Sequence, residues 1–205
     1  MVAHAAAARP VTLAERPDFS VIGEIIEPKS KVLDLGCGEG ELLAWLVENK
    51  GVMARGVEIS AQQVRKAIGR GVSAYQGDID EGLADYPDSA FDYVILSQTL
   101  QETRSPLQVL KEMLRVGRRA IVSFPNFGHW EVWRAMLFTG QAPKTKLFPY
   151  DWYNSPNIHF LSINDFEDLC RETGFPIEKR YFLSGARQVK HMPNLLAQTA
   201  VFLLG

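Results

Sequence analysis

Three glycines alternate at Gly36, Gly38 and Gly40, directly after a short apolar run that contains Asp34, and a helical pattern follows over 41–47. Glycine allows sharp backbone turns and lets a ligand lie against the main chain. A turn from a strand into a helix also leaves free N–H groups pointing outward at the start of the helix. This stretch therefore predicts a ligand-binding loop at the carboxyl end of the first strand of an α/β fold.

The spacing in this loop distinguishes between classes of ligand. Gly-x-Gly-x-Gly differs from the Gly-x-Gly-x-x-Gly of dinucleotide-binding loops, and no lysine follows the glycines as it does in a P-loop. Asp34, two residues before the first glycine, disfavours a phosphate and suits a cationic ligand. We therefore expect neither NAD nor nucleoside triphosphates to bind. Cys37 is interpreted as a small residue that the loop tolerates, in preference to a catalytic thiol.

Two further acids follow later apolar runs. Glu58 stands near the end of the second run, twenty positions after Gly38, where a carboxylate can accept both hydroxyls of a ribose. Asp78 and Ile79 follow the third run and are a plausible adenine contact, with the carboxylate on the amino group and the aliphatic face on the ring. In this order, the features look like the S-adenosylmethionine site of class I methyltransferases. The alternative is an ordinary α/β loop whose glycines serve packing.

We expect the cofactor to be S-adenosylmethionine or S-adenosylhomocysteine. The expected cofactor-binding residues are Asp34, Gly36, Cys37, Gly38, Gly40, Glu58, Ile59, Asp78, Ile79 and Ser97.

Apolar runs alternate with helical patterns along most of the chain, which predicts a doubly wound α/β sheet. The expected strands cover 31–35, 52–59, 72–76, 91–97, 119–124, 177–183 and 199–204. The expected helices cover 18–27, 39–49, 60–70, 105–115 and about 162–173. The last two strands should pair antiparallel at one edge. The expected fold is thus a Rossmann-like class I methyltransferase sheet of seven mostly parallel strands, with helices on both faces.

Length and composition predict one globular domain over 17–205, preceded by a flexible tail over 1–16. The chain has 205 residues, a formal net charge of −2 and no apolar run long enough to span a bilayer. Its two cysteines, Cys37 and Cys170, have no metal-like spacing. We therefore expect a cytoplasmic protein with reduced thiols and no nucleic-acid, membrane or metal partner.

The segment over 125–160 does not fit the regular alternation. It holds nine of the 21 Phe, Trp and Tyr residues of the chain, but only five charged residues. A short helix over 130–138 is expected within it. Its aromatic residues either cover the sheet edge and the ligand cleft, or face a partner protein, where Trp and Tyr are common anchors. The candidate partner-binding residues are Trp130, Trp133 and Trp152.

Catalytic residues stay unassigned. The residues over 97–102 lack the Asn-Pro-Pro-Tyr type of run that often follows the fourth strand in enzymes that methylate base or amide nitrogens. The four histidines show no paired spacing. His129 and His159 flank the aromatic-rich insertion and are candidates either for a base or for structural hydrogen bonding.

Six runs together resemble the MetW family of bacterial methionine-biosynthesis proteins, over about residues 17–204. The runs are 32–43, 56–59, 76–83, 91–101, 123–130 and 149–160. The most specific are Ser-Phe-Pro-Asn-Phe-Gly-His-Trp and Tyr-Asp-Trp-Tyr-Asn, because many methyltransferases share the glycine loop. The resemblance implies a role beside homoserine O-acetyltransferase, as the companion that this enzyme needs, with no established methyl acceptor.

Three functions are therefore weighed. The first is an S-adenosylmethionine-binding companion of homoserine O-acetyltransferase, and the second is a small-molecule methyltransferase. The third is a scaffold that keeps the loop without binding. Fold alone does not decide among them. The intact acids Asp34, Glu58 and Asp78 argue against the third, because an unused site has no reason to hold all three.

Overall fold

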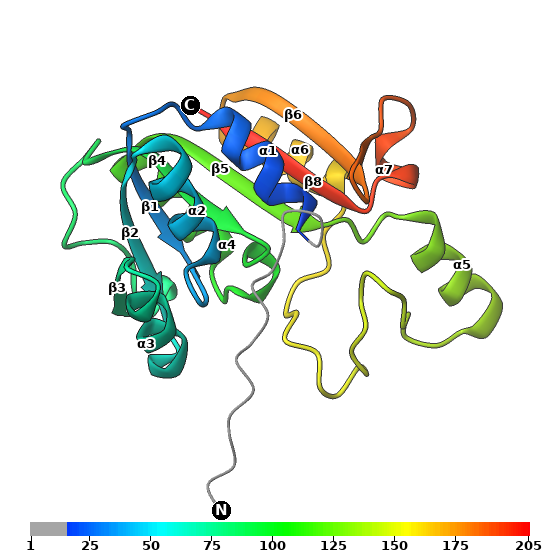
Figure 1. Cartoon of the computed structure of the whole chain (residues 1–205). Helices are drawn as coiled ribbons and strands as arrows, with labels where there is room; N and C mark the ends of the chain where they lie inside the picture. Colours follow the sequence, from blue (N-terminus) through cyan, green and yellow to red (C-terminus); the bar gives the residue numbers. More distant parts are fainter. Residues whose placement is uncertain (1–15) are drawn as a thin grey trace, which may run out of the picture.

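A computed structural model describes residues 16–205, which form an eight-stranded sheet with helices on both faces (Figure 1). The strand order is β3-β2-β1-β4-β5-β8-β6-β7. The strands are β1 (Lys31–Leu35), β2 (Met53–Glu58), β3 (Ser73–Gln76), β4 (Phe91–Ser97), β5 (Gly117–Pro125), β6 (Ile177–Ser184), β7 (Arg187–Gln188) and β8 (Thr199–Leu204). The first five pair in parallel, so their carboxyl ends meet along one edge of the sheet.

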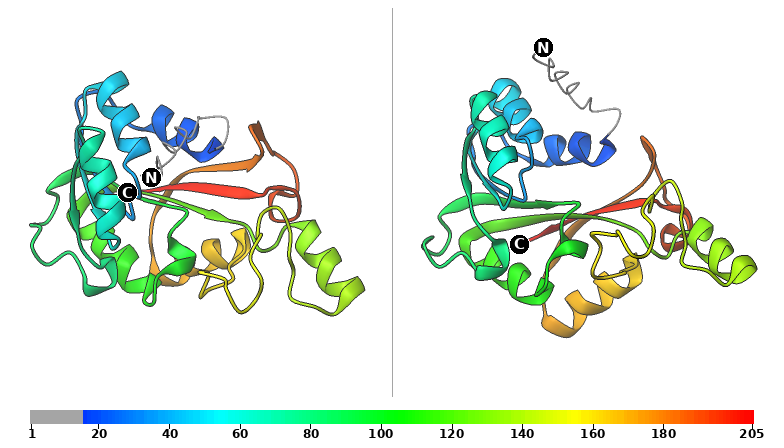
Figure 2. Two further views of the ribbon diagram at one scale, coloured as in Figure 1. Left: turned by 60° about the horizontal axis from the view of Figure 1, so that its bottom comes forward. Right: turned by 90° about the horizontal axis from the view of Figure 1, so that it is seen from below.

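Helices cover the two faces in separate groups (Figure 2). One face carries the first three helices, and the other carries the fourth and sixth. The α-helices are α1 (Pro17–Ile25), α2 (Glu41–Lys50), α3 (Ala61–Gly69), α4 (Pro106–Val116), α5 (Trp130–Thr139), α6 (Ile163–Thr173) and α7 (Pro193–Leu196). Two short 3-10 helices, η1 (Ile79–Glu81) and η2 (Leu100–Glu102), follow β3 and β4.

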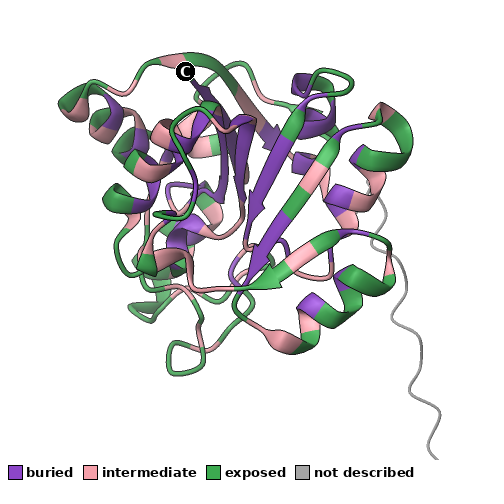
Figure 3. Ribbon diagram, turned by 90° about the vertical axis from the view of Figure 1, so that its left-hand side faces the viewer, coloured by how far each residue is buried: buried purple, intermediate pink, exposed green. Residues whose placement is uncertain are grey.

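The core divides into two hydrophobic clusters, one for each face of the sheet. Strand β1 supplies both, because successive side chains point to opposite faces. Val32 packs with residues of α1 and α2, whereas Leu33 and Leu35 pack with residues of α4 and α6. Burial is nearly continuous along β1, β5 and β8 and is lost toward β3, as Figure 3 shows. The long apolar runs in the sequence thus mark the strands covered on both faces.

The closing edge is antiparallel, which confirms the expected arrangement. Strand β8 lies between β5 and β6 and runs antiparallel to both. The sheet has eight strands instead of the expected seven. The additional one, β7, is a two-residue strand that returns from β6 through Gly185, whose φ is +55°. Two residues are too few to give an alternating pattern in the sequence.

The aromatic-rich insertion contains α5 and little other regular structure. His129 caps this helix by accepting the Glu131 amide on Nδ1, and Gly140 ends it with a φ of +62°. Val132 is the only buried residue of α5, and the helix stands away from the sheet in Figure 1.

The tail predicted over 1–16 lies outside the described residues apart from Arg16. Within 16–205, no helix is both long enough and apolar enough to cross a bilayer. The same residues hold no cluster of three or more His, Cys, Asp or Glu side chains arranged for a metal ion.

Candidate functional site

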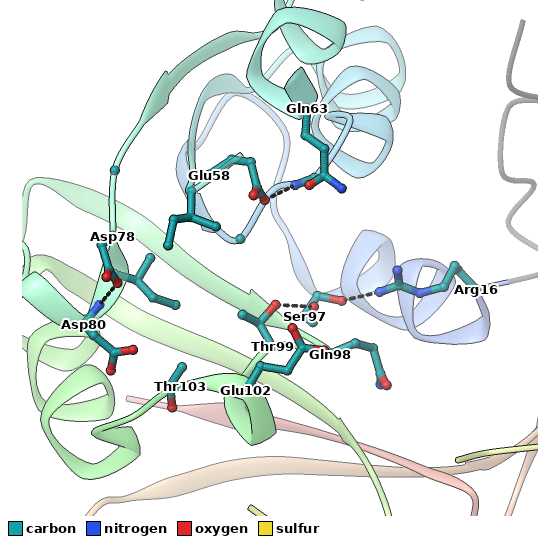
Figure 4. A pocket seen from close by; sticks show the side chains of 15 residues that line it. Arg16, Glu58, Gln63, Asp78, Asp80, Ser97, Gln98, Thr99, Glu102 and Thr103 are labelled. Carbon is teal, nitrogen blue, oxygen red and sulfur yellow. Dashed lines mark hydrogen bonds between the residues drawn. The ribbon is translucent and has the colours of Figure 1, made fainter. Parts of the chain in front are cut away.

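A cavity of about 340 Å³ opens beyond the carboxyl ends of β1, β2, β3 and β4. Seven of the ten predicted cofactor-binding residues line it, and Figure 4 shows three of them, Glu58, Asp78 and Ser97, around one space. These seven are Gly36, Gly38, Glu58, Ile59, Asp78, Ile79 and Ser97. The parallel sheet brings them together because each follows or ends a neighbouring strand.

At two positions of the loop, neighbouring atoms lie so close to the backbone that only glycine fits. Gly36 has a φ of +73°, and a Cβ there would lie 2.8 Å from Oγ1 of Thr99. Gly40 has a φ of +76°, and a Cβ there would lie 2.9 Å from the Cβ of Ala67 in α3. Any side chain at either position would be strained and would meet a neighbour. The loop is therefore pressed between α3 and the turn that follows β4.

Glu58 ties the end of β2 to this loop. Its Oε2 accepts the Gly38 amide at 3.0 Å, and its Oε1 accepts the Ser60 amide at 2.9 Å. Turning the side-chain amide of Gln63 over places its nitrogen 3.2 Å from Oε1. Glu58 is only 7% exposed, yet it lines the cavity. The same nitrogen then lies 3.3 Å from Oε2, so with Gly38 and Ser60 the four acceptor sites of the carboxylate are used, and a ligand's hydroxyl groups would take the place of Gln63.

Asp34 lies behind the cavity wall and does not line it. Burial raises the pKa of Asp34 to about 8, and the carboxylates of Glu58 and Asp18 add to this rise, against the opposing effect of Arg16. Its Oδ1 is buried without a hydrogen-bond partner among the described residues. Buried polar atoms normally have partners, so this oxygen has the capacity to accept a donor or a cation.

Cys37 also lies behind the wall. Its sulfur packs so closely on β2 that a Cβ at Gly56 would lie 2.5 Å from it. Burial raises the pKa of Cys37 to about 12, with Asp34 and Glu58 adding to the effect. A buried thiol with a raised pKa is a poor nucleophile. Cys37 therefore packs between the loop and β2, away from the cavity lining.

Asp78 and Asp80 form the other end of the cavity. Asp78 caps η1 by accepting the Asp80 amide at 2.9 Å, and its second oxygen accepts Nη2 of Arg104. Asp80 accepts the amides of Arg104 and Ser105, both at 2.9 Å. Burial raises the pKa of Asp80, but these bonds and the Arg104 charge outweigh it, so the net shift is downward. Arg104 and Asp78 therefore form an ion pair at this end of the cavity.

Eight further residues line the cavity without having been predicted from the sequence. They are Arg16, Gln63, Gly77, Asp80, Gln98, Thr99, Glu102 and Thr103. One of these residues is marked by its backbone conformation, which the sequence does not reveal. Gln98 has a φ of +55°, in a region that non-glycine residues rarely occupy. Its amide donates to the carbonyl of Ser123 at 2.9 Å, which holds this conformation. Burial and the nearby Glu58 raise the pKa of Glu102.

A buried polar network joins α1 to the ends of β4 and β5. Arg16 donates to both oxygens of Asp18, from Nε and Nη2 at 3.0 Å, and from Nη2 to Ser97 at 2.8 Å. Ser97 and Ser123 donate to Oδ2 of Asp18, at 2.7 Å and 3.0 Å. Burial raises the pKa of Asp18, but Arg16 and the two serines outweigh it, and the net shift is downward. Asp18 is therefore a buried, ionised carboxylate.

A second buried residue anchors the base of the insertion. The side chain of Asn126 donates to the carbonyls of Asn194 and Ala197, at 2.8 Å and 2.7 Å. Its Oδ1 accepts the amides of Gly128 and Ile163, at 3.0 Å and 3.2 Å. Asn126 therefore ties the start of the insertion to the start of α6 and to both ends of α7.

The far end of the insertion is joined to the cavity rim. The carbonyl of Gln101 in η2 accepts the amides of Ile158 and His159, at 2.8 Å and 3.0 Å. The side chain of Gln101 donates to the carbonyl of Gln98 at 2.7 Å. A hydrogen-bonded path therefore runs from the cavity lining to the segment that ends the insertion.

Exposed aromatic residues gather on the insertion. Trp130, Trp133 and Trp152 are 40%, 58% and 79% exposed. Phe127 packs against the buried Phe148 and against Phe160, which is itself 59% exposed. A second cavity of about 320 Å³ lies there, with Trp152 among its lining residues. His129 is buried and its pKa is lowered by burial, against the opposing charge of Glu131, which fits its capping role.

A family model described as methionine biosynthesis protein MetW matches residues 16–204. The chain belongs to the MetW family. A bifunctional methionine biosynthesis protein MetXA/MetW from Rhodopirellula baltica is 38% identical over 197 residues, which is 90% of this chain. The chain spans only 32% of that relative's length.

Solved structures show the same architecture. An S-adenosylmethionine-dependent methyltransferase from Thermotoga maritima superposes with a TM-score of 0.65 at 19% identity, over 92% of this chain and 87% of that one. Another from Archaeoglobus fulgidus gives a TM-score of 0.65 at 15% identity, over 94% and 92%. The MetW-family chain therefore has the class I methyltransferase fold, as its strand and helix pattern predicted.

Proposed function

We propose that the chain binds S-adenosylmethionine or S-adenosylhomocysteine in the cavity beyond β1, β2, β3 and β4. Glu58, which lines the cavity and is held by the glycine loop, supports a ribose contact. Asp34 does not line the cavity, so its support for a cationic ligand is electrostatic: a positive charge in the cavity would stabilise the ionised form of this buried carboxyl group. The similarity to S-adenosylmethionine-dependent methyltransferases supports the same ligand class.

We further propose that the chain acts in the cytoplasm as the companion of homoserine O-acetyltransferase. The observation that carries this is the Rhodopirellula baltica relative, named for MetXA and MetW in one chain. We take the MetXA part as the acyltransferase. Fusion holds two partners at a high effective concentration and is useful where they act together. The companion would supply the same association without a covalent link.

The aromatic-rich insertion is the proposed contact surface. Its exposed members include Trp133, Trp152 and Tyr153, and it has few charges. Gathered apolar side chains of this kind mark interaction sites, and Trp and Tyr are enriched among the anchors of interfaces. Helix α5 stands away from the sheet in Figure 1, so a partner would reach it without disturbing the core.

The test is acyltransferase activity with and without this protein. The homoserine O-acetyltransferase of the same cell is assayed alone, with this protein, and with this protein plus S-adenosylmethionine. We expect the activity of the acyltransferase to require the added protein, or the two proteins to co-elute in gel filtration. An acyltransferase that is equally active in all three samples, with no co-elution in gel filtration, would remove the companion role.

A small-molecule methyltransferase is the second candidate. It is favoured by Glu102, a cavity-lining carboxyl whose pKa is raised, which suits a proton acceptor beside a methyl acceptor. The measurement is transfer of labelled methyl groups from S-adenosylmethionine to a metabolite extract. Labelled product that requires Glu102 would favour this candidate over the companion role.

A further inference from the structure

Arg16 is the single positively charged side chain lining the cavity within residues 16–205. The other charged groups of the lining are acids: Glu58, Asp78, Asp80 and Glu102. An S-adenosyl amino acid, in contrast, carries both signs, because its amino-acid end has an ammonium and a carboxylate. The acids suit the ammonium and the sulfonium, but the carboxylate needs a cation or hydrogen-bond donors.

The order of side chains along the cavity indicates where that carboxylate would lie. Figure 4 shows Asp78 and Arg16 at opposite sides, with Glu58 between them. With ribose at Glu58, as proposed above, and adenine at Asp78, as expected from the sequence, the amino-acid end extends toward Ser97 and Arg16. Arg16 therefore lies at the end of the cavity where we expect the carboxylate of such a ligand to bind.

The guanidinium of Arg16 is oriented and still has donors to offer. Its Nε and Nη2 bond to Asp18 and Ser97, whereas Nη1 makes no hydrogen bond with residues 16–205. Its side chain is 33% exposed, while that of Asp18 is 3% exposed. A guanidinium fixed on one side by a buried carboxylate loses little freedom when a second carboxylate binds on the other.

We propose that Arg16 binds the α-carboxylate of the ligand's amino-acid end. Asp18 is the positioning residue, since it holds the guanidinium while Ser97 and Ser123 hold Asp18 in turn. This assignment rests on the proposed function, because it names how the same cavity recognises one part of an S-adenosyl ligand.

A matched pair of ligands isolates this contact. S-adenosylmethionine and decarboxylated S-adenosylmethionine differ only in the carboxylate and share adenine, ribose, sulfonium and ammonium. In the parent protein, S-adenosylmethionine should bind more tightly. Without Arg16, the acidic lining should favour the more positive decarboxylated ligand, so the preference should vanish or reverse.

Calorimetric titration of both ligands against the parent and Arg16→Gln tests the proposal. A hydrogen-bonded ion pair lost in this way predicts about 10- to 100-fold weaker binding of S-adenosylmethionine. Binding of the decarboxylated ligand should change by less than about 3-fold. Arg65→Gln is the matched control, because it removes one arginine charge from α3 at a side chain that does not line the cavity.

Arg16→Gln leaves Asp18 buried without its cation, and that loss can unfold the protein. The double variant Arg16→Gln with Asp18→Asn removes both charges and serves as the second test protein, with the melting temperature of each recorded. Equal weakening of both ligands in a folded variant would overturn the carboxylate contact, and so would a parent protein that binds both equally. A parent that binds neither ligand would instead overturn the proposed cofactor site itself.

Discussion

The cavity and the aromatic-rich insertion are built in opposite ways. The cavity is formed by short turns at the ends of parallel strands, and buried groups such as Glu58 and Asp18 fix its shape. The insertion is anchored at Asn126 but presents its large side chains, including Trp152, to solvent. A small ligand needs preorganised polar groups, whereas a protein partner can cover apolar surface. The contrast therefore suits the two regions to two kinds of binding.

The largest effect is expected at the base of the insertion. Asn126→Ala removes a fully buried side chain that makes four hydrogen bonds to the backbone of four other residues. Leaving such groups unpaired should lower the free energy of unfolding by about 3–5 kcal/mol. Urea denaturation measures this loss. A loss below about 1 kcal/mol would mean that the insertion is not anchored as described.

The next effect separates ligand binding from partner binding. Glu58→Ala should weaken S-adenosylmethionine binding about 10- to 100-fold, because hydrogen bonds to a charged group are lost. The variant should still associate with the acyltransferase in the absence of the ligand. Calorimetry and gel filtration measure the two properties, with Glu48→Ala in α2 as a control that removes an exposed glutamate. Equal affinity for variant and parent would remove Glu58 from the ribose contact.

The converse variant lies on the insertion. Trp152→Ala should weaken association with homoserine O-acetyltransferase by about 2 kcal/mol if Trp152 is an anchor. Its melting temperature should stay close to that of the parent, because this side chain is already mostly exposed. Met53→Ala on β2 removes another exposed apolar side chain and is the control. Trp152→Ala and the equivalent variants of Trp130 and Trp133 that stay folded with full affinity would place the interface elsewhere.

The last prediction is a dependence of stability on pH, which is the smallest of these effects over a single pH unit but accumulates across the range. The pKa of Asp34 is raised from an ordinary 3.8 to about 8 in the folded chain, so folding takes up a proton between these values. Stability should therefore fall as the pH rises from about 4 to about 8, by at most about 1.4 kcal/mol per pH unit. Melting temperatures across this range measure the effect. Asp34→Asn should flatten this dependence, and an unchanged profile in that variant would assign the effect to another group.

The parts of the site that were predictable from the sequence depend on short spacings. Gly36, Gly38 and Glu58 lie close to strand ends that apolar runs mark, and parallel pairing then brings those ends together. The network of Arg16, Asp18 and Ser123 had no such signal. Asp18 and Ser123 are 105 positions apart, and only the packing of α1 against the sheet joins them.

The fold likewise has elements that were predictable from the sequence and elements that were not. Strands as long as β4 and β5 were predictable because both faces are covered and the apolar run is continuous. The two-residue β7 and the four-residue α7 depend on contacts with β6 and with Asn126, which no local pattern encodes. The exposure of Trp152 was also out of reach, because an aromatic residue in an irregular segment packs inward or outward according to its neighbours.

The two amides that donate to the Gln101 carbonyl can report how firmly the insertion is held at the cavity rim. Hydrogen exchange at Ile158 and His159 requires their bonds to η2 to open, so the exchange rate of these amides records how firmly the cavity rim holds the insertion. The isotope label would be read in the segment that ends the insertion, while the event that it records is the opening of contacts beside the ligand cavity.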